Sequence, residues 1–291
     1  MRLFAALLAA ASLAPVLAQA QASPVVLELY TSQGCSSCPP ADALFAELAR
    51  RDDVIALALH VDYWDYLGWR DDFARPRHTA RQKAYAKAAR SRTIFTPEMI
   101  IQGEDRLKGH AAAAIVADIA ARLREPAGAA LAVTREGDTI RIDLAPAGGD
   151  LGPVALGGTA GSVGAPEATG APATAKAAPP APADGAASFA AASGPGASPG
   201  PSPGPASGPA SGPADIHVVR YIPEQEVAIG GGENAGQTLT YRNIVTDWKT
   251  IGQWDGRTPA DFVVPDAGGG PVAVIVQQAR MGPILAAARL P

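Results

Sequence analysis

The sequence has very little cysteine, few aromatic residues and no excess of positive charge. Cys35 and Cys38 are its only cysteines, so it can form at most one intramolecular disulfide. Aromatic residues make up 5% of the 291 residues, and the formal net charge is −4. Such a weakly acidic chain has no electrostatic basis for binding nucleic acid or an anionic membrane surface, and we expect neither partner.

Long apolar runs are also missing, except at the N-terminus. Arg2 precedes an apolar stretch over residues 3–17, and small residues follow up to Ala22. This order is typical of a cleavable secretory signal peptide, here residues 1–22, and Pro15 argues against a retained membrane anchor. We therefore predict an exported protein, periplasmic or secreted, with no stable membrane insertion after signal cleavage. Disulfides persist in those compartments.

Residues 147–214 differ from the rest of the chain. They are rich in Ala, Pro, Gly and Ser and contain almost no side chain that could fill a core. A segment of this composition cannot bury enough apolar surface to offset the entropy that it would lose on ordering. We predict a disordered low-complexity insert between two ordered parts of the protein.

The part of the chain before this insert alternates between strand and helix patterns. Residues 24–30 and 54–61 are continuous apolar runs that predict buried strands, and residues 41–50 between them have helical spacing. A strand, a helix and a second strand in this order favour a parallel sheet. Three further elements are expected: a helix over 79–89, a strand over 98–101 and a helix over 111–123.

The rest of the chain has the pattern of β structure. Short β-prone runs separated by turn residues fill residues 215–291, and residues 130–144 suggest a hairpin. We therefore predict an α/β domain over residues 24–125 and a β-rich, antiparallel domain formed from residues 128–146 and 215–291. The glycine-rich stretch 230–236 joins strand to strand, which predicts a turn rather than a nucleotide-binding loop.

Cys35 and Cys38 form a C-x-x-C motif where the first predicted strand gives way to the first helix. Unpaired amides and the positive dipole end of a helix N-terminus favour thiolate over thiol, which makes Cys35 the candidate nucleophile. Cys38 would then be the resolving thiol that breaks a mixed disulfide. The motif is also compatible with a structural disulfide or a metal clip, and these alternatives stay open.

His60 and Asp62 lie near the end of the second predicted strand, at the sheet edge where Cys35 emerges. His60 is a candidate for giving or taking a proton during exchange; the alternative is a hydrogen-bonded structural histidine. Cys35, Cys38 and His60 would supply three ligands for copper or zinc, but no fourth ligand is evident. We therefore assign no metal site and no cofactor. The aromatic stretch 63–69 is either a substrate-binding lip or a local aromatic core.

The order of predicted elements resembles the thioredoxin-like superfamily. A strand, a C-x-x-C motif, a helix, a strand and a helix are followed by Thr96 and Pro97 and a further short strand. This resemblance implies a thioredoxin-like fold over residues 24–125, with Pro97 as a cis-proline that faces the disulfide. Such a proline would keep a backbone edge open for an extended substrate, whereas an ordinary trans turn proline is the alternative.

Three stretches carry a narrower resemblance: LYTSQGCSSCPPADA (29–43), HVDYWDYLGW (60–69) and GENAG (232–236). They resemble a family of secreted bacterial proteins catalogued as domain-of-unknown-function family 1223. This resemblance covers the ordered parts of the chain but not the insert. It implies a fold but little about substrate, because the family has no established activity.

Together these patterns predict an exported thiol–disulfide oxidoreductase. We expect it to act on a protein or small-molecule thiol or disulfide through Cys35, Cys38, Pro97 and His60. A function of another class is also compatible with the sequence. In that alternative, the chain is a non-catalytic periplasmic module that binds a metal or a partner and keeps the disulfide for stability.

Overall fold

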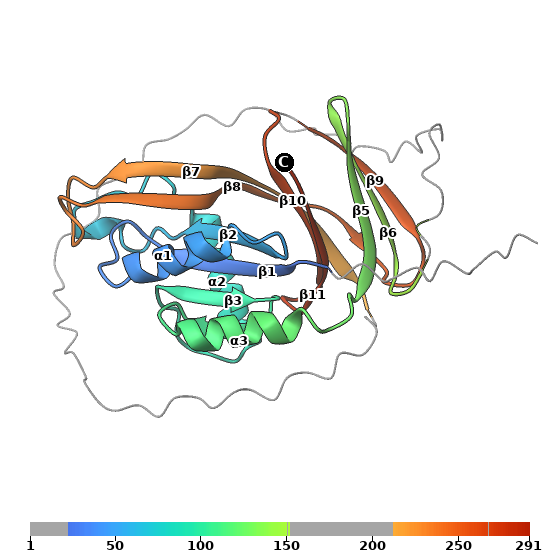
Figure 1. The fold of residues 1–291 in the computed structure, drawn as a ribbon, viewed down its shortest axis with the longest axis horizontal. Coiled ribbons are helices and arrows are strands. Elements are labelled where there is room, and N and C mark those ends of the chain that lie inside the picture. The colour runs from blue at the N-terminus through green and yellow to red at the C-terminus, as the bar shows by residue number, and fades with distance from the viewer. Residues whose placement is uncertain (1–22, 150, 152–211, 267) are drawn as a thin grey trace, which may run out of the picture. The chain divides into compact units, whose positions relative to one another are not determined.

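In the computed structural model, which describes residues 23–149, 151, 212–266 and 268–291, eight strands form one mixed sheet and three form a second sheet (Figure 1). The large sheet has the order β11-β10-β7-β8-β2-β1-β3-β4. Its strands are β1 (Val25–Thr31), β2 (Val54–His60), β3 (Glu98–Ile101), β4 (Asp105–Lys108), β7 (Ala214–Ala228), β8 (Thr238–Trp254), β10 (Val272–Gln278) and β11 (Ile284–Leu290). The small sheet, β5-β6-β9, contains β5 (Ala129–Glu136), β6 (Thr139–Pro146) and β9 (Ala260–Pro265). The helices are α1 (Pro39–Leu48), α2 (Pro76–Ala88) and α3 (Ala112–Arg122), with a 3-10 helix η1 (Asp65–Leu67).

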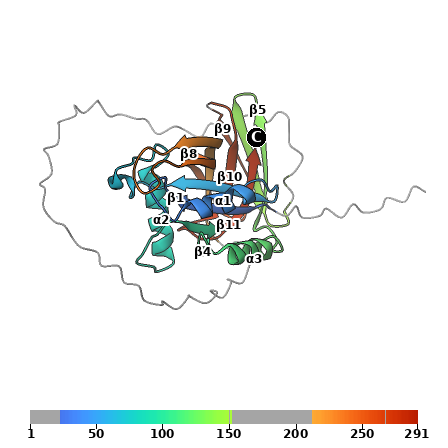
Figure 2. The same ribbon diagram turned by 60° about the vertical axis from the view of Figure 1, so that its left-hand side comes forward.

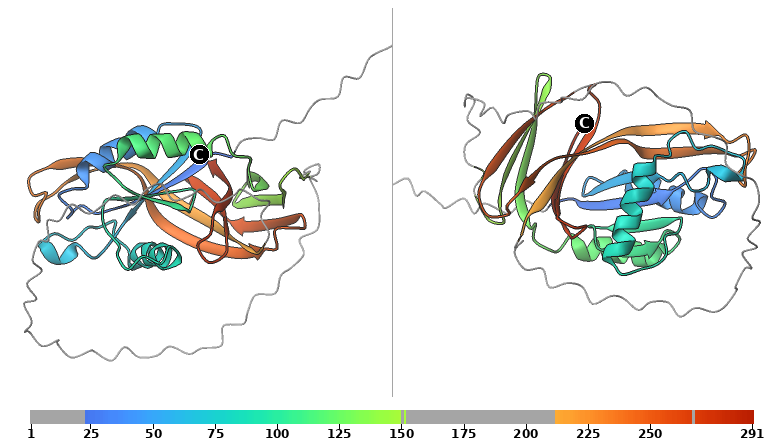
Figure 3. Two further views of the ribbon diagram at one scale, coloured as in Figure 1. Left: turned by 90° about the horizontal axis from the view of Figure 1, so that it is seen from below. Right: turned by 180° about the vertical axis from the view of Figure 1, so that it is seen from behind.

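The parallel pair β1 and β2 lies at the centre of the large sheet. All seven residues of each strand are buried, and Val25 pairs with Val54 while Thr31 pairs with His60. The strands are buried on both sides because α1 and α3 cover one face of the sheet and α2 covers the other (Figure 3). This double cover explains why both sequences are almost continuously apolar rather than alternating.

The helix α1 follows β1 after the cysteine motif. It begins with Pro39 and Pro40, which suit a first helical turn because that turn's amides have no partner inside the helix. Ala41, Phe45 and Leu48 point into the core between α1 and the sheet. The spacing of these apolar residues therefore fixes which side of α1 faces the sheet, and Cys38 stands immediately before its first turn.

The strands after residue 212 extend the sheet of the N-terminal half. β8 pairs in parallel with β2 through Ala58 and Ile244, and it pairs antiparallel with β7 along most of its length. The structure therefore differs from the expectation of two separate domains, because residues 24–125 and much of 215–291 share one sheet within one compact unit. Local periodicity shows that a segment is a strand, but it does not show which distant strand it pairs with.

The small sheet contains the hairpin that the sequence predicts near residues 130–144. β5 and β6 pair antiparallel over their whole length, and β9 pairs with the other edge of β6. Apolar side chains of this sheet pack against β7, β10 and β11 in a second core, and Figure 2 shows β5 and β9 beside β10. The small sheet lies away from the cysteine motif and does not contribute to the site described below.

Two predicted segments lie outside the described residues. They are the signal peptide over residues 1–22 and all but a few residues at each end of the insert over 147–214. Within the part of the chain that the structure describes, no helix combines the length and the apolar character needed to span a bilayer.

Candidate functional site

Cys35 and Cys38 form a disulfide between the end of β1 and the start of α1, as the sequence allows. Their Cα atoms are 5.4 Å apart. Two turn hydrogen bonds shape the connection, from Cys35 N to Ser32 O at 3.1 Å and from Cys38 N to Cys35 O at 3.1 Å. The loop therefore places both sulfur atoms at the N-terminal end of a ten-residue helix.

The disulfide is buried, although the residues between the cysteines are not. Cys35 and Cys38 are both 0% exposed, whereas Ser36 and Ser37 are exposed. The Ser37 hydroxyl lies 3.4 Å from Cys35 Sγ. The surface at this point thus consists of the serines and of neighbouring loops, with the sulfur atoms beneath them.

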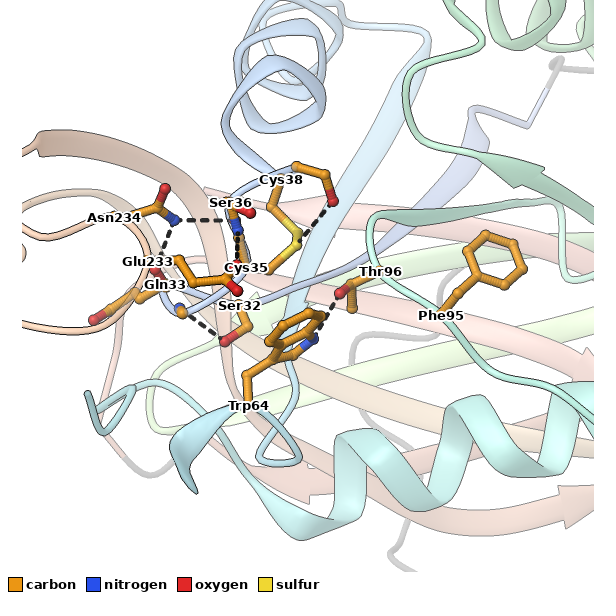
Figure 4. The surroundings of a disulfide bond; sticks show 12 residues. Ser32, Gln33, Cys35, Ser36, Cys38, Trp64, Phe95, Thr96, Glu233 and Asn234 are labelled. Carbon is orange, nitrogen blue, oxygen red and sulfur yellow. Dashed lines mark hydrogen bonds between the residues drawn. A yellow bond between two sulfur atoms is a disulfide. The ribbon is translucent and has the colours of Figure 1, made fainter. Parts of the chain in front are cut away.

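Pro97 lies beside the first turn of α1. The Thr96–Pro97 peptide bond is cis. Gly109 packs between Pro97 and Ala41 so closely that an added Cβ would be 2.8 Å from the Cβ atoms of both residues. Thr96 accepts a hydrogen bond from Trp64 Nε1 at 2.7 Å, and Figure 4 shows the indole directed at Thr96 on the same side as the disulfide. Pro97 therefore packs against the first turn of the helix that begins after Cys38, and like both cysteines it is buried.

His60 is buried and hydrogen-bonded to an aspartate that the sequence analysis did not single out. His60 Nδ1 lies 2.7 Å from Asp71 Oδ2, and neither side chain is accessible to solvent. Burial raises the pKa of Asp71, but the opposing effects of His60 and of backbone amides from Gln33 and Phe73 hold it below its usual range. Asp62, the neighbour that the sequence suggested, accepts instead from Thr79 Oγ1 at 2.6 Å.

One atom of His60 and three buried polar atoms around it have no hydrogen-bond partner among the described residues. They are Thr31 Oγ1, Asp42 Oδ2, His60 Nε2 and Tyr241 Oη. Thr31 pairs with His60 across β1 and β2, and the rings of His60 and Tyr241 are 4.9 Å apart. Unpartnered polar atoms are uncommon in protein interiors, so a group of four marks this cluster as a candidate for proton transfer.

Asp42 gives this cluster an acid that titrates near neutral pH. It lies on α1 one turn after Cys38, and its backbone amide donates to Cys38 O at 3.0 Å. Burial raises the pKa of Asp42 to about 7, although the neighbouring His60 opposes the rise. An aspartate in the first turn of a helix ordinarily interacts only with the helix dipole, so the sequence offers little sign of this environment.

A loop from the second half of the chain covers the cysteine motif. Asn234 lies between β7 and β8, and its Nδ2 donates to Gln33 O at 2.8 Å and to Cys35 O at 3.0 Å. The adjacent Glu233 carboxylate accepts from Ser36 N at 3.3 Å (Figure 4). The glycine-rich stretch 230–236 is a turn, as predicted, but its contact with the cysteines could not be inferred from local sequence.

The aromatic stretch 63–69 contacts both the cysteine motif and this loop. Trp69 Nε1 donates to Gln33 Oε1 at 2.8 Å, and a Cβ added to Gly231 would be 2.7 Å from Gly68 O. Tyr66, in contrast, is 81% exposed. The stretch therefore combines the two alternatives considered from sequence, because its tryptophans and Tyr63 are packed in the structure whereas Tyr66 is free to contact another molecule.

Within the described ranges, no three His, Cys, Asp or Glu side chains are grouped so that they could hold a metal ion. The copper or zinc alternative therefore gains no support from side-chain geometry. His60 Nδ1 is directed at Asp71, and the two sulfur atoms are bonded to each other.

Comparison with known proteins identifies the family of this chain. Residues 26–155 and 154–277 match the family described as protein of unknown function DUF1223. The chain belongs to the DUF1223 family. The three stretches that resembled this family, over residues 29–43, 60–69 and 232–236, are far apart in sequence but are in contact around the disulfide in the structure.

Solved structures similar to this DUF1223 protein include two from bacteria. An X-ray crystal structure of an Agrobacterium tumefaciens protein from a structural genomics programme has 26% sequence identity and a TM-score of 0.63, with 93% of this chain and 95% of that chain covered. HBP35 of Porphyromonas gingivalis has 14% identity and a TM-score of 0.46, with coverage of 92% and 74%. No curated protein matches the chain.

Proposed function

We propose that this protein is an exported, thioredoxin-like thiol–disulfide oxidoreductase that works through Cys35 and Cys38. The observation that carries the proposal is the position of the disulfide at the N-terminal end of α1, the helix whose first turn packs near Pro97 and bears Asp42 of the buried polar cluster. These are the groups that thiol–disulfide exchange requires: a thiolate, a resolving thiol and a means of moving protons.

The arrangement of elements supports a thioredoxin-like architecture for the first half of the chain. β1, α1 and β2 form a parallel unit, β3 pairs antiparallel with β1, and α3 lies on the same face of the sheet as α1. The strands β7 and β8 then add to the opposite edge of this unit. We propose that this added hairpin adapts a thioredoxin-like core to a particular substrate.

Exchange with a dithiol substrate proceeds in two steps. A substrate thiolate attacks Cys35 Sγ, a new S–S bond forms, and the Cys35–Cys38 bond breaks with its electron pair leaving on Cys38. The second substrate thiolate then attacks the mixed disulfide and releases Cys35 as a thiolate, so that two electrons pass from substrate to protein. In the reverse direction, Cys35 attacks a substrate disulfide and Cys38 resolves the mixed disulfide.

The buried cluster supplies the proton exchange that these steps need. Cys38 takes up a proton when it leaves and must lose one when it attacks, while Asp42 lies one helical turn away. Because the pKa of Asp42 is about 7, its carboxyl group can both donate and accept a proton near neutral pH. His60, whose Nδ1 faces Asp71, keeps Nε2 available to relay that proton within the cluster.

The proposed setting is the periplasm or the exterior of the cell, and the proposed partners are protein or small-molecule thiols and disulfides. The signal-like residues 1–22 and the single cysteine pair support export, because disulfides persist in oxidising compartments. The acidic balance of the chain gives no reason to expect nucleic acid as a partner.

Trapping of a mixed disulfide tests this function. In the Cys38→Ser variant, Cys35 has no resolving partner, so a covalent complex with the natural substrate should accumulate in the producing cell. Non-reducing electrophoresis and mass spectrometry would reveal the complex and the substrate's identity. The matched control is Cys35→Ser, which retains Cys38 but should trap far less. Absence of any complex in Cys38→Ser, or equal trapping by both variants, would contradict the proposal.

A second function is favoured by one observation, the complete burial of both cysteines. In this alternative, the disulfide only stabilises a non-catalytic module that binds a partner. The reduction potential of the pair and the rate at which Cys35 is alkylated after reduction distinguish the two. A strongly reducing potential together with an unreactive Cys35 would favour the structural disulfide.

A further inference from the structure

The disulfide cannot react in the conformation that the structure describes. Cys35 and Cys38 are 0% exposed, and a thiolate must reach a sulfur atom along the axis of the S–S bond. Ser36 and Ser37 are exposed, so the site lies just under the surface rather than deep in the core. A neighbouring segment must therefore move before any exchange can occur.

The segment best placed to move is the loop of residues 230–236 between β7 and β8, which we name the 230–236 loop. Asn234 is 2% exposed, and its amide donates to the backbone oxygens of both Gln33 and Cys35. Glu233 accepts from Ser36 N. These three hydrogen bonds attach the loop to the backbone on both sides of Cys35, which makes it the long-range neighbour held most directly against the buried disulfide.

The construction of the loop allows such a movement. Its ends are joined by two backbone hydrogen bonds, from Ile229 N to Gln237 O at 2.9 Å and from Gly236 N to Ile229 O at 2.8 Å. Between these ends, Gly232 and Gly236 have φ values of 71° and 82°, which glycine adopts readily. The closed position is thus held mainly by contacts with the cysteine segment and with the 63–69 stretch, while the base of the hairpin stays anchored in the sheet.

The loop also carries a charge at the entrance to the site. Glu233 is exposed, and its carboxylate lies 3.3 Å from the Ser36 amide between the two cysteines. A negative charge there raises the energy of an approaching molecule that carries additional negative charge, and lowers it for a molecule with a positive group. The effect is largest at low ionic strength, where screening is weak.

We propose that the 230–236 loop is a gate over the Cys35–Cys38 disulfide, that Asn234 holds it closed, and that Glu233 makes the opened site select cationic thiol or disulfide substrates over anionic ones. The gate rests on the proposed function only in that both concern the same disulfide. The step that it controls is the attack of a substrate thiolate on Cys35 Sγ, with Cys38 leaving as a thiolate.

The charge preference is tested with three small monothiols acting on the oxidised full chain at low salt. Cysteamine carries a positive group, 2-mercaptoethanol is neutral, and 3-mercaptopropionate carries a negative group; each rate is divided by the thiolate concentration. We expect the cationic thiol to react fastest and the anionic thiol slowest. In Glu233→Gln, the ratio of cationic to anionic rates should fall about threefold or more. The matched control is Glu226→Gln, an exposed glutamate of β7, which should leave the ratio unchanged.

The proposed role of Asn234 in holding the loop closed is tested by the rate of reaction with the neutral thiol. Asn234→Ala removes the two hydrogen bonds that Asn234 donates to the cysteine segment, together with the one that it accepts from Gln237, and it should raise all three rates by about tenfold while preserving their ratio. Gly231→Ala is a second variant with every donor intact; its Cβ would clash with Gly68 O and push the loop outward, so it should also react faster. Thermal unfolding verifies that each variant is folded.

Two results would overturn this proposal. One is unchanged rates in both Asn234→Ala and Gly231→Ala, and the other is an unchanged ratio of cationic to anionic rates in Glu233→Gln. These measurements report access to the disulfide whether or not a natural substrate exists. Failure of the Cys38→Ser trapping experiment would therefore count against the oxidoreductase function while leaving the gate intact. Conversely, successful trapping with unchanged monothiol rates would retain the function and reject the gate.

Discussion

His60 Nδ1 and Asp71 Oδ2 are 2.7 Å apart, and both side chains are closed off from solvent. The same Asp71 oxygen accepts from Gln33 N at 2.9 Å. One carboxylate therefore joins the end of β2 to the turn that precedes Cys35. Because of this shared partner, a change at Asp71 should affect both the stability of the protein and the surroundings of the disulfide.

Asp71→Asn should lower the free energy of unfolding by about 2–3 kcal/mol, the usual range for losing hydrogen bonds to a buried charged group. Denaturant unfolding at pH 7 measures this change. Asp72→Asn is the matched control, because Asp72 is the adjacent residue but is exposed, and it should change stability little. If both variants lose the same stability, the His60–Asp71 bond does not have the importance that its geometry suggests.

His78 and His217 should make the protein sensitive to mild acid. Burial lowers the pKa of each to about 4, so both are neutral in the folded protein but protonate in the unfolded chain below about 6.5. Because the unfolded chain binds these protons first, the free energy of unfolding is highest above that pH and decreases as the pH falls toward 4, by up to about 3 kcal/mol for each histidine.

Unfolding midpoints between pH 7 and 4 test this sensitivity to acid. His78→Asn keeps a donor for His60 O, to which His78 Nδ1 is bonded at 2.9 Å, and it should flatten the acid-induced loss of stability. The exposed His110→Asn should retain the wild-type profile. An unaltered profile in His78→Asn would show that this histidine does not titrate as the structure implies.

Asp42 should make the stability of the protein depend on pH in the opposite direction to His78 and His217. Because burial raises its pKa in the folded protein to about 7, the stabilisation from its neutral form is complete below about 4 and is lost as the pH rises through 7. Asp42→Asn stays neutral throughout, so its stability relative to wild type should increase from pH 4.5 to pH 8. Parallel stability profiles for the two proteins would contradict this assignment.

Arg81 and Glu28 should be among the most sensitive positions in the core. Arg81 Nη2 lies 2.7 Å from Glu28 Oε1, and Glu28 is fully buried. Although burial raises the pKa of Glu28, the charge and hydrogen bonds of Arg81 and of two tyrosines hold it below its usual range. Arg81→Ala would leave this carboxylate without its counter-charge, at a cost of about 3–5 kcal/mol.

The matched control for Arg81 is a surface ion pair. Arg50 and Glu47 are both more than half exposed, so Arg50→Ala should cost less than about 1 kcal/mol. The double variant Glu28→Gln with Arg81→Met removes both charges together, and in denaturant unfolding it should be more stable than Arg81→Ala alone. The reverse order would show that the ion pair itself, rather than the unpaired carboxylate, determines the stability.

Much of the fold around the cysteines follows from local sequence. The continuous apolar runs of β1 and β2, the prolines that begin α1 and the apolar spacing along α1 together predict a strand–helix–strand unit with Cys35 and Cys38 at its junction. The three family stretches also identify DUF1223. These features need only the order and spacing of residues, because they depend on interactions within one element or between neighbouring elements.

The tertiary structure alone decided what surrounds the disulfide. Asn234 reaches Cys35 across 199 positions in sequence, Tyr241 enters the buried cluster from β8, and Asp71 is the hydrogen-bond partner of His60. The contacts of Asn234 and Tyr241 depend on the pairing of β8 with β2, and that of Asp71 depends on the course of the loop after β2. Local propensity carries no information about such long-range pairing, so the sequence by itself determined the cysteine pair and its place between a strand and a helix, whereas the assembled sheet determined its burial and its polar neighbours.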